Sequence, residues 1–280
     1  MNRLDPWLSR WGALVLVSAA FLTAPSAASA RLVIKSEFIP SDPPPNIIGG
    51  GNLVEIFKTA AATWEKAFPG GQPWVLDLQY EWAPLGPGLN AQFILKSQGG
   101  RPHRILSGLI QFNNTGLMRF FADPTPGDHS DYTEYHEEFA DAPKGVINVG
   151  RRLSGATGDA ALGIDLLTIA AHEIGHGLGV TAQNPEFEPL ILVTPPRPFR
   201  GLVILTSRDH LANSYALMGQ EYFVEWGVRT LISSLDVLAE AQISRFNHPN
   251  LDPYAVVPPR TSRQPVRGGR SRGRARRAAR

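Results

Sequence analysis

Cysteine is absent from the sequence of 280 residues. Its absence excludes a framework of disulfide bonds, thiolate ligands for a metal ion and a cysteine nucleophile. Long apolar runs are also missing: no segment after the N-terminal region is apolar enough to cross a membrane. Hydrophobic residues make up 43% and charged residues 19% of the chain, a balance typical of a globular protein with a buried core. The length is sufficient for one sizeable domain or two small ones.

Acidic residues are missing from the end of the chain. Residues 260–280 contain nine arginines and no acid. Since the chain holds 27 basic and 25 acidic residues in all, residues 1–259 carry a net charge of −7. We predict a disordered, Arg-rich tail over 248–280 that binds an anionic surface, such as a cell-surface polymer or lipid headgroups, with no specific nucleic acid as its partner. The alternative is a solvated tail without a specific partner.

The N-terminus has the pattern of a secretory signal peptide over residues 1–30. Arg3 and Arg10 make its start weakly positive, and an apolar run extends from Gly12 to Leu22. Small residues then offer a cleavage site after Ala30, so we expect a secreted or periplasmic protein without a transmembrane segment in the mature chain. A membrane anchor is the alternative, but this apolar run is too short to span hydrocarbon.

Hydrophobic periodicity predicts three helices and several strands. The helices cover 52–68, with Asn52 as its cap, 165–179, with Asp165 as its cap, and 233–244, capped by Ser233 or Ser234. We therefore expect an α+β fold, with a twisted mixed β-sheet backed by helices, in a domain spanning 31–247. The predicted strands cover 32–39, 74–86, 91–97, 104–114 and 145–151.

A polar segment over 123–141 contains two histidines and seven acids. Carboxylates and imidazoles are ligands for cations, so this segment is a candidate for a structural calcium ion or a second zinc ion. The alternative is a solvated acidic loop without an ion.

The stretch HEIGH provides the strongest functional signal. His172 and His176 are four residues apart on the predicted helix, so both imidazoles point to the same side and can bind one metal ion. Glu173 is too close in sequence to be a natural third ligand, but its carboxylate can take a proton from water that the metal makes acidic. The alternative is that this spacing arose by accident on an amphipathic helix.

These residues resemble the metzincin zinc endopeptidases, and within them the matrixin branch. HEIGHGLG matches the first eight positions of the family's zinc-binding pattern, and YALMGQEY at 215–222 is similar to the methionine turn of matrixins. The resemblance implies a metzincin-like catalytic domain with a zinc cofactor, with Met218 beneath the metal and Tyr222 beside the specificity pocket. Ala182 replaces the family's third histidine, Gln220 replaces a proline, and the lack of cysteine excludes the cysteine-switch form of latency.

The third ligand must then come from elsewhere in the chain. In matrixins the third histidine precedes the turn methionine by eight residues, and His210 precedes Met218 by eight. The resemblance therefore implies that an insertion over about 180–208 displaces the ligand, as in the leishmanolysin-like branch. Asp209 is the nearest competitor, and an ordinary surface histidine is the alternative for His210. The other candidates in the mature chain are His103, His129, His136 and His248.

The residues and the resemblance together predict a secreted zinc-dependent endopeptidase acting on a protein or peptide substrate. Its metal ligands are His172, His176 and His210, and Glu173 is its general base. The alternative is a catalytically inactive, secreted surface-binding protein that retains the metallopeptidase fold.

Overall fold

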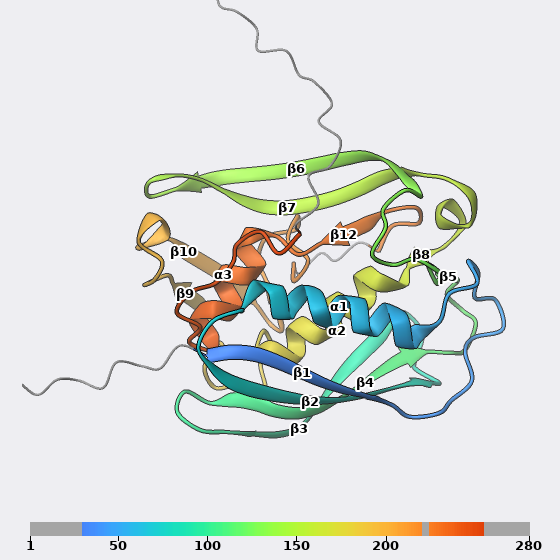
Figure 1. The fold of residues 1–280 in the computed structure, drawn as a ribbon, viewed down its shortest axis with the longest axis horizontal. Coiled ribbons are helices and arrows are strands. Elements are labelled where there is room, and N and C mark those ends of the chain that lie inside the picture. Colours follow the sequence, from blue (N-terminus) through green and yellow to red (C-terminus); the bar gives the residue numbers. More distant parts are fainter. Residues whose placement is uncertain (1–29, 220–223, 255–280) are drawn as a thin grey trace, which may run out of the picture.

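The computed structural model describes residues 30–219 and 224–254 (Figure 1). They form several β-sheets and few helices, which confirms the α+β class at this coarse level. Residues 1–29 of the predicted signal peptide, Gln220, Tyr222 and the tail from residue 255 onward lie outside the described residues.

The largest sheet has four strands in the order β1-β2-β4-β3. Strand β2 pairs in parallel with both β1 and β4, whereas β3 pairs antiparallel with β4, so the sheet is mixed as predicted. Strand β3 is one edge of this sheet. The strands are β1 (Ala30–Phe38), β2 (Gln72–Ala83), β3 (Ala91–Gly99) and β4 (Arg104–Asn113).

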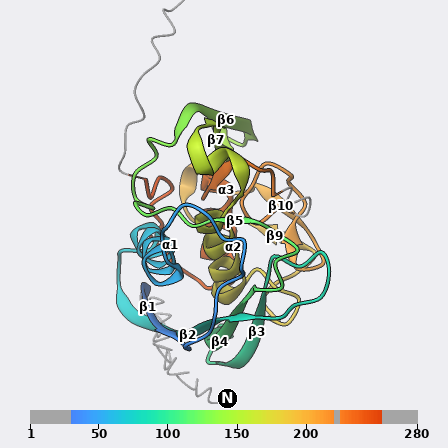
Figure 2. The ribbon, with the colours of Figure 1, turned by 90° about the vertical axis from the view of Figure 1, so that its right-hand side faces the viewer.

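Two helices cover one face of this sheet (Figures 1 and 2). Helix α1 (Leu53–Ala67) begins at the predicted cap, where the Asn52 side chain accepts a hydrogen bond from the backbone of Glu55. The apolar side of α1 and the whole of helix α2 (Leu166–Leu178) are buried. The indole Nε1 of Trp64 on α1 donates a hydrogen bond of 2.8 Å to the carbonyl oxygen of Ala171 on α2, which ties the helices together.

A second sheet, with the order β12-β7-β6, lies on the opposite side of the helices from the first (Figures 1 and 2). Its strands are β6 (Tyr132–Ala142), β7 (Gly145–Ala156) and β12 (Arg229–Leu231). Strand β6 corrects the sequence prediction of a polar loop over 123–141. Most of its side chains are exposed, so it lacks the apolar alternation that marks a half-buried strand.

The residues predicted as an insertion form a hairpin of their own. Strands β9 (Leu190–Leu192) and β10 (Val203–Ser207) pair antiparallel, and β10 also pairs with β11 (His210–Leu211). The connection from β9 to β10 contains the 3-10 helix η2 (Arg197–Phe199). The inner face of this small sheet packs in a second apolar cluster with residues of the third helix.

The remaining elements are short, apart from the helix α3 (Ser234–Ile243). Its cap is Ser233, one of the two predicted residues, in a reciprocal arrangement with Asp236. Strands β5 (Phe120–Phe121) and β8 (Ile164–Asp165) pair in parallel, and the 3-10 helix η1 (Gly158–Leu162) lies between β7 and β8.

The body of the protein extends beyond the predicted boundary at residue 247. The Tyr254 hydroxyl accepts a hydrogen bond of 2.9 Å from the backbone N–H of Ile232, and Asp252 lies 3.0 Å from the guanidinium of Arg151. Residues 248–254 are therefore packed against the body, which corrects the prediction that they belong to a disordered tail.

In the described part of the chain, no helix is both long enough and apolar enough to cross a bilayer.

Candidate metal centre

Three histidines from two separate segments converge beside the C-terminal half of helix α2. His172 and His176 come from the helix and His210 comes from β11. Their ring centroids lie 4.7, 5.3 and 5.1 Å apart, and one ring nitrogen from each lies within 4.8 Å of the others. Within residues 30–219 and 224–254, this is the one group of three or more potential ligands gathered so closely. The three histidines could bind a metal ion.

Local sequence fixes the helix that carries the first two histidines. Asp165 caps α2 by accepting a hydrogen bond of 2.9 Å from the backbone N–H of Thr168. The helix ends at Gly179, whose φ of +141° lies in a region that favours glycine. Both boundaries agree with the sequence prediction. Four residues of helical spacing then place His172 and His176 on the same side.

Backbone carbonyls fix the tautomers of these two imidazoles. Nδ1 of His172 lies 2.8 Å from the carbonyl oxygen of Leu217, and Nδ1 of His176 lies 2.6 Å from that of Val180. A carbonyl oxygen only accepts, so Nδ1 carries the proton in each ring. In a neutral imidazole Nε2 is then deprotonated, which is the state that a metal ligand requires.

Burial keeps the histidines neutral. Loss of hydration lowers the pKa of His172 well below its usual value, and the neighbouring histidines lower it further. Burial also lowers the pKa of His176 to about 4 and lowers that of His210, although Asp209 counteracts part of the effect on His210. Neutral imidazoles close together form a ligand set that needs no proton release before a cation binds.

Glu173 is a buried carboxyl group beside this set. Its side chain is only 6% exposed, and its Oε2 atom has no hydrogen-bond partner among the described residues. Burial raises the pKa of Glu173 to about 8. An unpartnered buried carboxyl oxygen is costly, and a nearby cation with its water would satisfy it. The donor set and this unpartnered atom both fit a bound metal ion.

A tight hairpin carries His210 to the site. His210 pairs with Ser207 across a two-residue turn, in which Arg208 has a φ of +52°. The Asp209 carboxylate in this turn accepts hydrogen bonds from the backbone N–H of Ala182 at 2.7 Å and from the hydroxyl of Thr181 at 3.3 Å. The turn is thereby fastened to the loop that follows α2.

The alternative ligands weighed from sequence lie elsewhere or have other partners. Asp209 binds the loop at Ala182 and is not a member of the three-residue group. His129 contacts Arg229, His136 contacts Ser154 and Glu134, and His103 lies beside Glu186. His248 is among the described residues but outside the group.

Met218 packs directly against the helix that carries the histidines. A methyl group at Gly175, between His172 and His176, would overlap the Met218 sulfur, so this close contact requires glycine. Asp236 of α3 holds the methionine segment from the other side by accepting hydrogen bonds from the backbone N–H groups of Leu217 and Met218. The contact of Asp236 with the methionine segment could not be predicted from the sequence. The sequence around Asp236 indicates a capping box, and that motif accounts only for its contact with the start of α3.

A cleft of about 420 Å³ opens over the three histidines and Glu173. Residues 88–93, which include the start of the edge strand β3, form one wall. The loop after α2 and the hairpin turn with Asp209 form the other side. An extended ligand can therefore reach the histidines along the free edge of β3.

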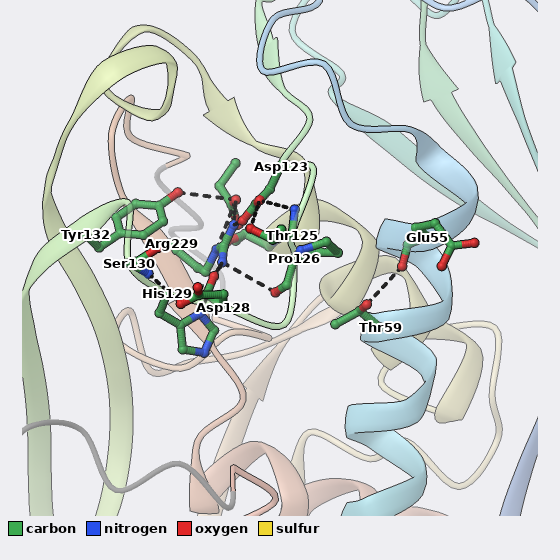
Figure 3. Close-up of polar contacts among 12 residues, drawn as sticks. Glu55, Thr59, Asp123, Thr125, Pro126, Asp128, His129, Ser130, Tyr132 and Arg229 are labelled. Atoms are coloured by element: carbon green, nitrogen blue, oxygen red, sulfur yellow. Dashed lines mark hydrogen bonds and ion pairs between the residues drawn. The ribbon is translucent and has the colours of Figure 1, made fainter.

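The start of the acidic segment after β5 lies against a buried arginine, and the structure gives no support to the predicted calcium or second zinc ion there (Figure 3). The guanidinium of Arg229 is fully buried and lies 2.6 Å from the Asp123 carboxylate and 2.8 Å from that of Asp165. It also donates to the backbone of Asp128. Within the described residues, the acids of this segment belong to no group of three or more close metal ligands. Asp123 instead neutralises a positive charge of the protein itself.

The comparisons with known proteins identify no relative: no protein-family model matches the chain, and neither a curated protein nor a solved structure does.

Proposed function

We propose that the chain is a zinc-dependent endopeptidase, in which His172, His176 and His210 hold the metal ion and Glu173 is the general base. The observation that carries the proposal is the convergence of three neutral imidazoles with an unpartnered, buried carboxyl group on one cleft. Catalytic zinc sites combine three protein ligands with one position for water or substrate. The cleft above the histidines supports such an open position.

The choice of zinc rests on the residue pattern. Imidazoles also bind copper, iron and nickel, so the three histidines alone do not select the metal. The spacing of His172, Glu173 and His176 is that of zinc peptidases. When bound, zinc would supply Lewis-acid polarisation of a carbonyl oxygen and lower the pKa of water.

Glu173 would move the proton. A cation held by the histidines favours the ionised form of a neighbouring carboxyl group, which opposes the effect of burial on the Glu173 pKa. The carboxylate then accepts a proton from the attacking water and delivers it to the leaving amine. Asp209, the other carboxyl group of the cleft, is held by Ala182 and is suited to positioning instead.

An extended peptide fits the cleft better than a compact ligand does. Strand β3 pairs only with β4 among the described strands, so its other edge can form main-chain hydrogen bonds with a peptide. Such pairing recognises the backbone and leaves side-chain preference to the walls of the cleft. This arrangement supports a protein or peptide substrate.

Hydrolysis of casein and of a peptide library by residues 31–280 tests the proposal. We expect cleavage that a chelator abolishes and added zinc restores. Glu173→Gln should bind zinc as the parent does and should cleave nothing, because it lacks the base and keeps the ligands. Equal cleavage by the parent and Glu173→Gln would contradict the proposed mechanism.

The second candidate is an exported surface-binding protein that keeps the fold and the metal without turnover. Export itself remains a prediction from the N-terminal sequence. The unpartnered Glu173 favours the enzyme, since a protein that only binds gains nothing from burying such a group. Zinc binding by the parent without cleavage in the same assays would favour the binding protein.

A further inference from the structure

The small sheet of β9 and β10 has two apolar faces. Its inner face is buried in the second apolar cluster and carries Ile191 and Ile204, which are direct partners across the strands. Its outer face carries two other cross-strand pairs, Leu190 with Leu205 and Leu192 with Val203. Successive side chains alternate between faces, so these four aliphatic residues lie together on the outer face.

This outer face, the aliphatic patch of Leu190, Leu192, Val203 and Leu205, is open to solvent. The four side chains are 49%, 53%, 48% and 60% exposed, respectively. An antiparallel sheet with one solvated face normally places polar residues on that face. Contiguous exposed aliphatic residues instead mark a surface that meets an apolar partner.

Positive charge borders one end of the patch. The connection that joins Leu192 to Val203 contains Arg197 and Arg200, both exposed and neither in an ion pair with another described residue. The acids that flank the hairpin in the sequence are Glu186 and Glu188, which precede β9, and Asp209, which follows β10, so they lie toward its opposite end. The patch thus combines an aliphatic face with a cationic tip.

We propose that the aliphatic patch and its two arginines dock on an anionic lipid bilayer. Aliphatic side chains at an interface enter the boundary between headgroups and acyl chains, while arginines pair with headgroup phosphates. A second copy of the chain fits less well, because stable protein interfaces need about 800 Å² from each partner, far more than four half-exposed side chains supply.

A fluorescent label on the patch tests the proposal in the full chain. The lack of cysteine makes Leu192→Cys a unique attachment point for an environment-sensitive fluorophore such as nitrobenzoxadiazole. The matched control is Leu117→Cys, because Leu117 is 64% exposed and lies in the loop between β4 and β5, away from the patch in sequence. On addition of vesicles of phosphatidylcholine and phosphatidylserine, we expect a blue shift and a several-fold rise in emission at 192 and no change at 117.

The charge requirement is tested in the Leu192→Cys background. Arg197→Ala with Arg200→Ala should weaken vesicle binding roughly 30-fold, at about 1 kcal/mol per arginine near an anionic surface. The control pair Lys96→Ala with Lys144→Ala removes two exposed charges from other surfaces and should change binding much less.

Three results would overturn the proposal. In the first, the protein sediments with vesicles while the label at 192 keeps its aqueous spectrum, which would mean that the arginine-rich segment 260–280 alone makes the contact. The second is an equal spectral change at 117. The third is a change at 192 that needs no vesicles and grows with protein concentration, which would identify a second copy as the partner. None of these readouts depends on peptide hydrolysis.

Discussion

Loss of the Asp209 carboxylate should weaken metal binding moderately, whereas loss of His210 should weaken it by orders of magnitude. Asp209→Ala removes a charged acceptor that lies 2.7 Å from the backbone N–H of Ala182. A hydrogen bond to a charged group contributes about 1.5–3 kcal/mol, and the half-exposed setting of Asp209 points to the lower end. If the whole loss appears in metal affinity, zinc binds roughly tenfold more weakly.

His210→Ala removes a metal ligand, whereas Asp209→Ala removes only a contact of the turn that carries this ligand. Structural zinc sites have binding free energies of roughly 10–16 kcal/mol, so an even share for each of four ligands is about 2.5–4 kcal/mol. That share corresponds to a loss of affinity of roughly 70- to 900-fold. Asp209→Asn keeps an acceptor oxygen and should fall between the parent and Asp209→Ala.

Competition with a chromogenic zinc chelator measures these affinities at one pH. The expected order of affinity is the parent, Asp209→Asn, Asp209→Ala and then His210→Ala. Ala182→His should not rescue His210→Ala, because the side chain at 182 is exposed and outside the three-histidine group. The reasoning fails if His210→Ala binds zinc as tightly as the parent, or if Asp209→Ala is as damaging as His210→Ala.

Three further perturbations test separate parts of the account. Gly175→Ala should lower the free energy of unfolding in urea by about 1–3 kcal/mol, because its methyl group would overlap Met218. Gly177→Ala in the same helix is the control, since its methyl group meets only ordinary contacts from 3.4 Å and should be neutral or stabilising. Equal effects of the two substitutions would contradict the packing argument. Burial, then Asp236, raises the pKa of Glu240 well above its usual 4.5, with the Val180 backbone opposing the shift only in part. The proton on Glu240 therefore contributes stability that is fully present below pH 4.5 and is lost as pH rises toward the folded-state pKa. Relative to the parent, the free energy of unfolding of Glu240→Gln should therefore rise by up to about 1.4 kcal/mol per pH unit above 4.5. A difference between the two metal-free proteins that does not change with pH would refute this. Removal of residues 260–280 should leave hydrolysis of a small soluble peptide unchanged and weaken retention on an anionic resin, by less as salt is added; identical retention would remove the role of the tail in anchoring.

Local signals in the sequence were sufficient to predict the three helices and the placement of His172 and His176 on one side of α2. Asp165 and Gly179 mark the ends of α2 through a cap and a left-handed glycine, both of which depend only on neighbouring residues. His210 required a different signal, its spacing from Met218, because a hairpin lies between it and the helix. The structure brings all three histidines together, in agreement with the set chosen from sequence.

Long-range contacts between polar residues could not be predicted in the same way. Arg229 neutralises Asp123 and Asp165 across more than 60 residues of sequence, and nothing local distinguishes that arginine from an exposed one. From sequence alone, the acids around Asp123 are therefore candidate ligands for an external cation or members of a solvated loop. Strand β6 was missed for a related reason, since an exposed edge strand lacks the apolar alternation on which a strand prediction depends.

The tail boundary depended on composition alone. Pro253 is buried and the hydroxyl of Tyr254 accepts from the backbone of Ile232, but proline and tyrosine near a basic segment do not reveal such packing. The apolar outer face of β9 and β10 was equally invisible, because the pairing register decides which leucines share a face.

Anomalous X-ray diffraction at the zinc absorption edge, from crystals of the zinc-loaded protein, tests the central claim most directly. The account predicts a peak in the cleft at about 2.0–2.1 Å from one ring nitrogen each of His172, His176 and His210, with Glu173 next to the ion and not bound to it. A peak coordinated by Asp209 or Glu173 in place of His210, or no peak at the three histidines, would contradict it.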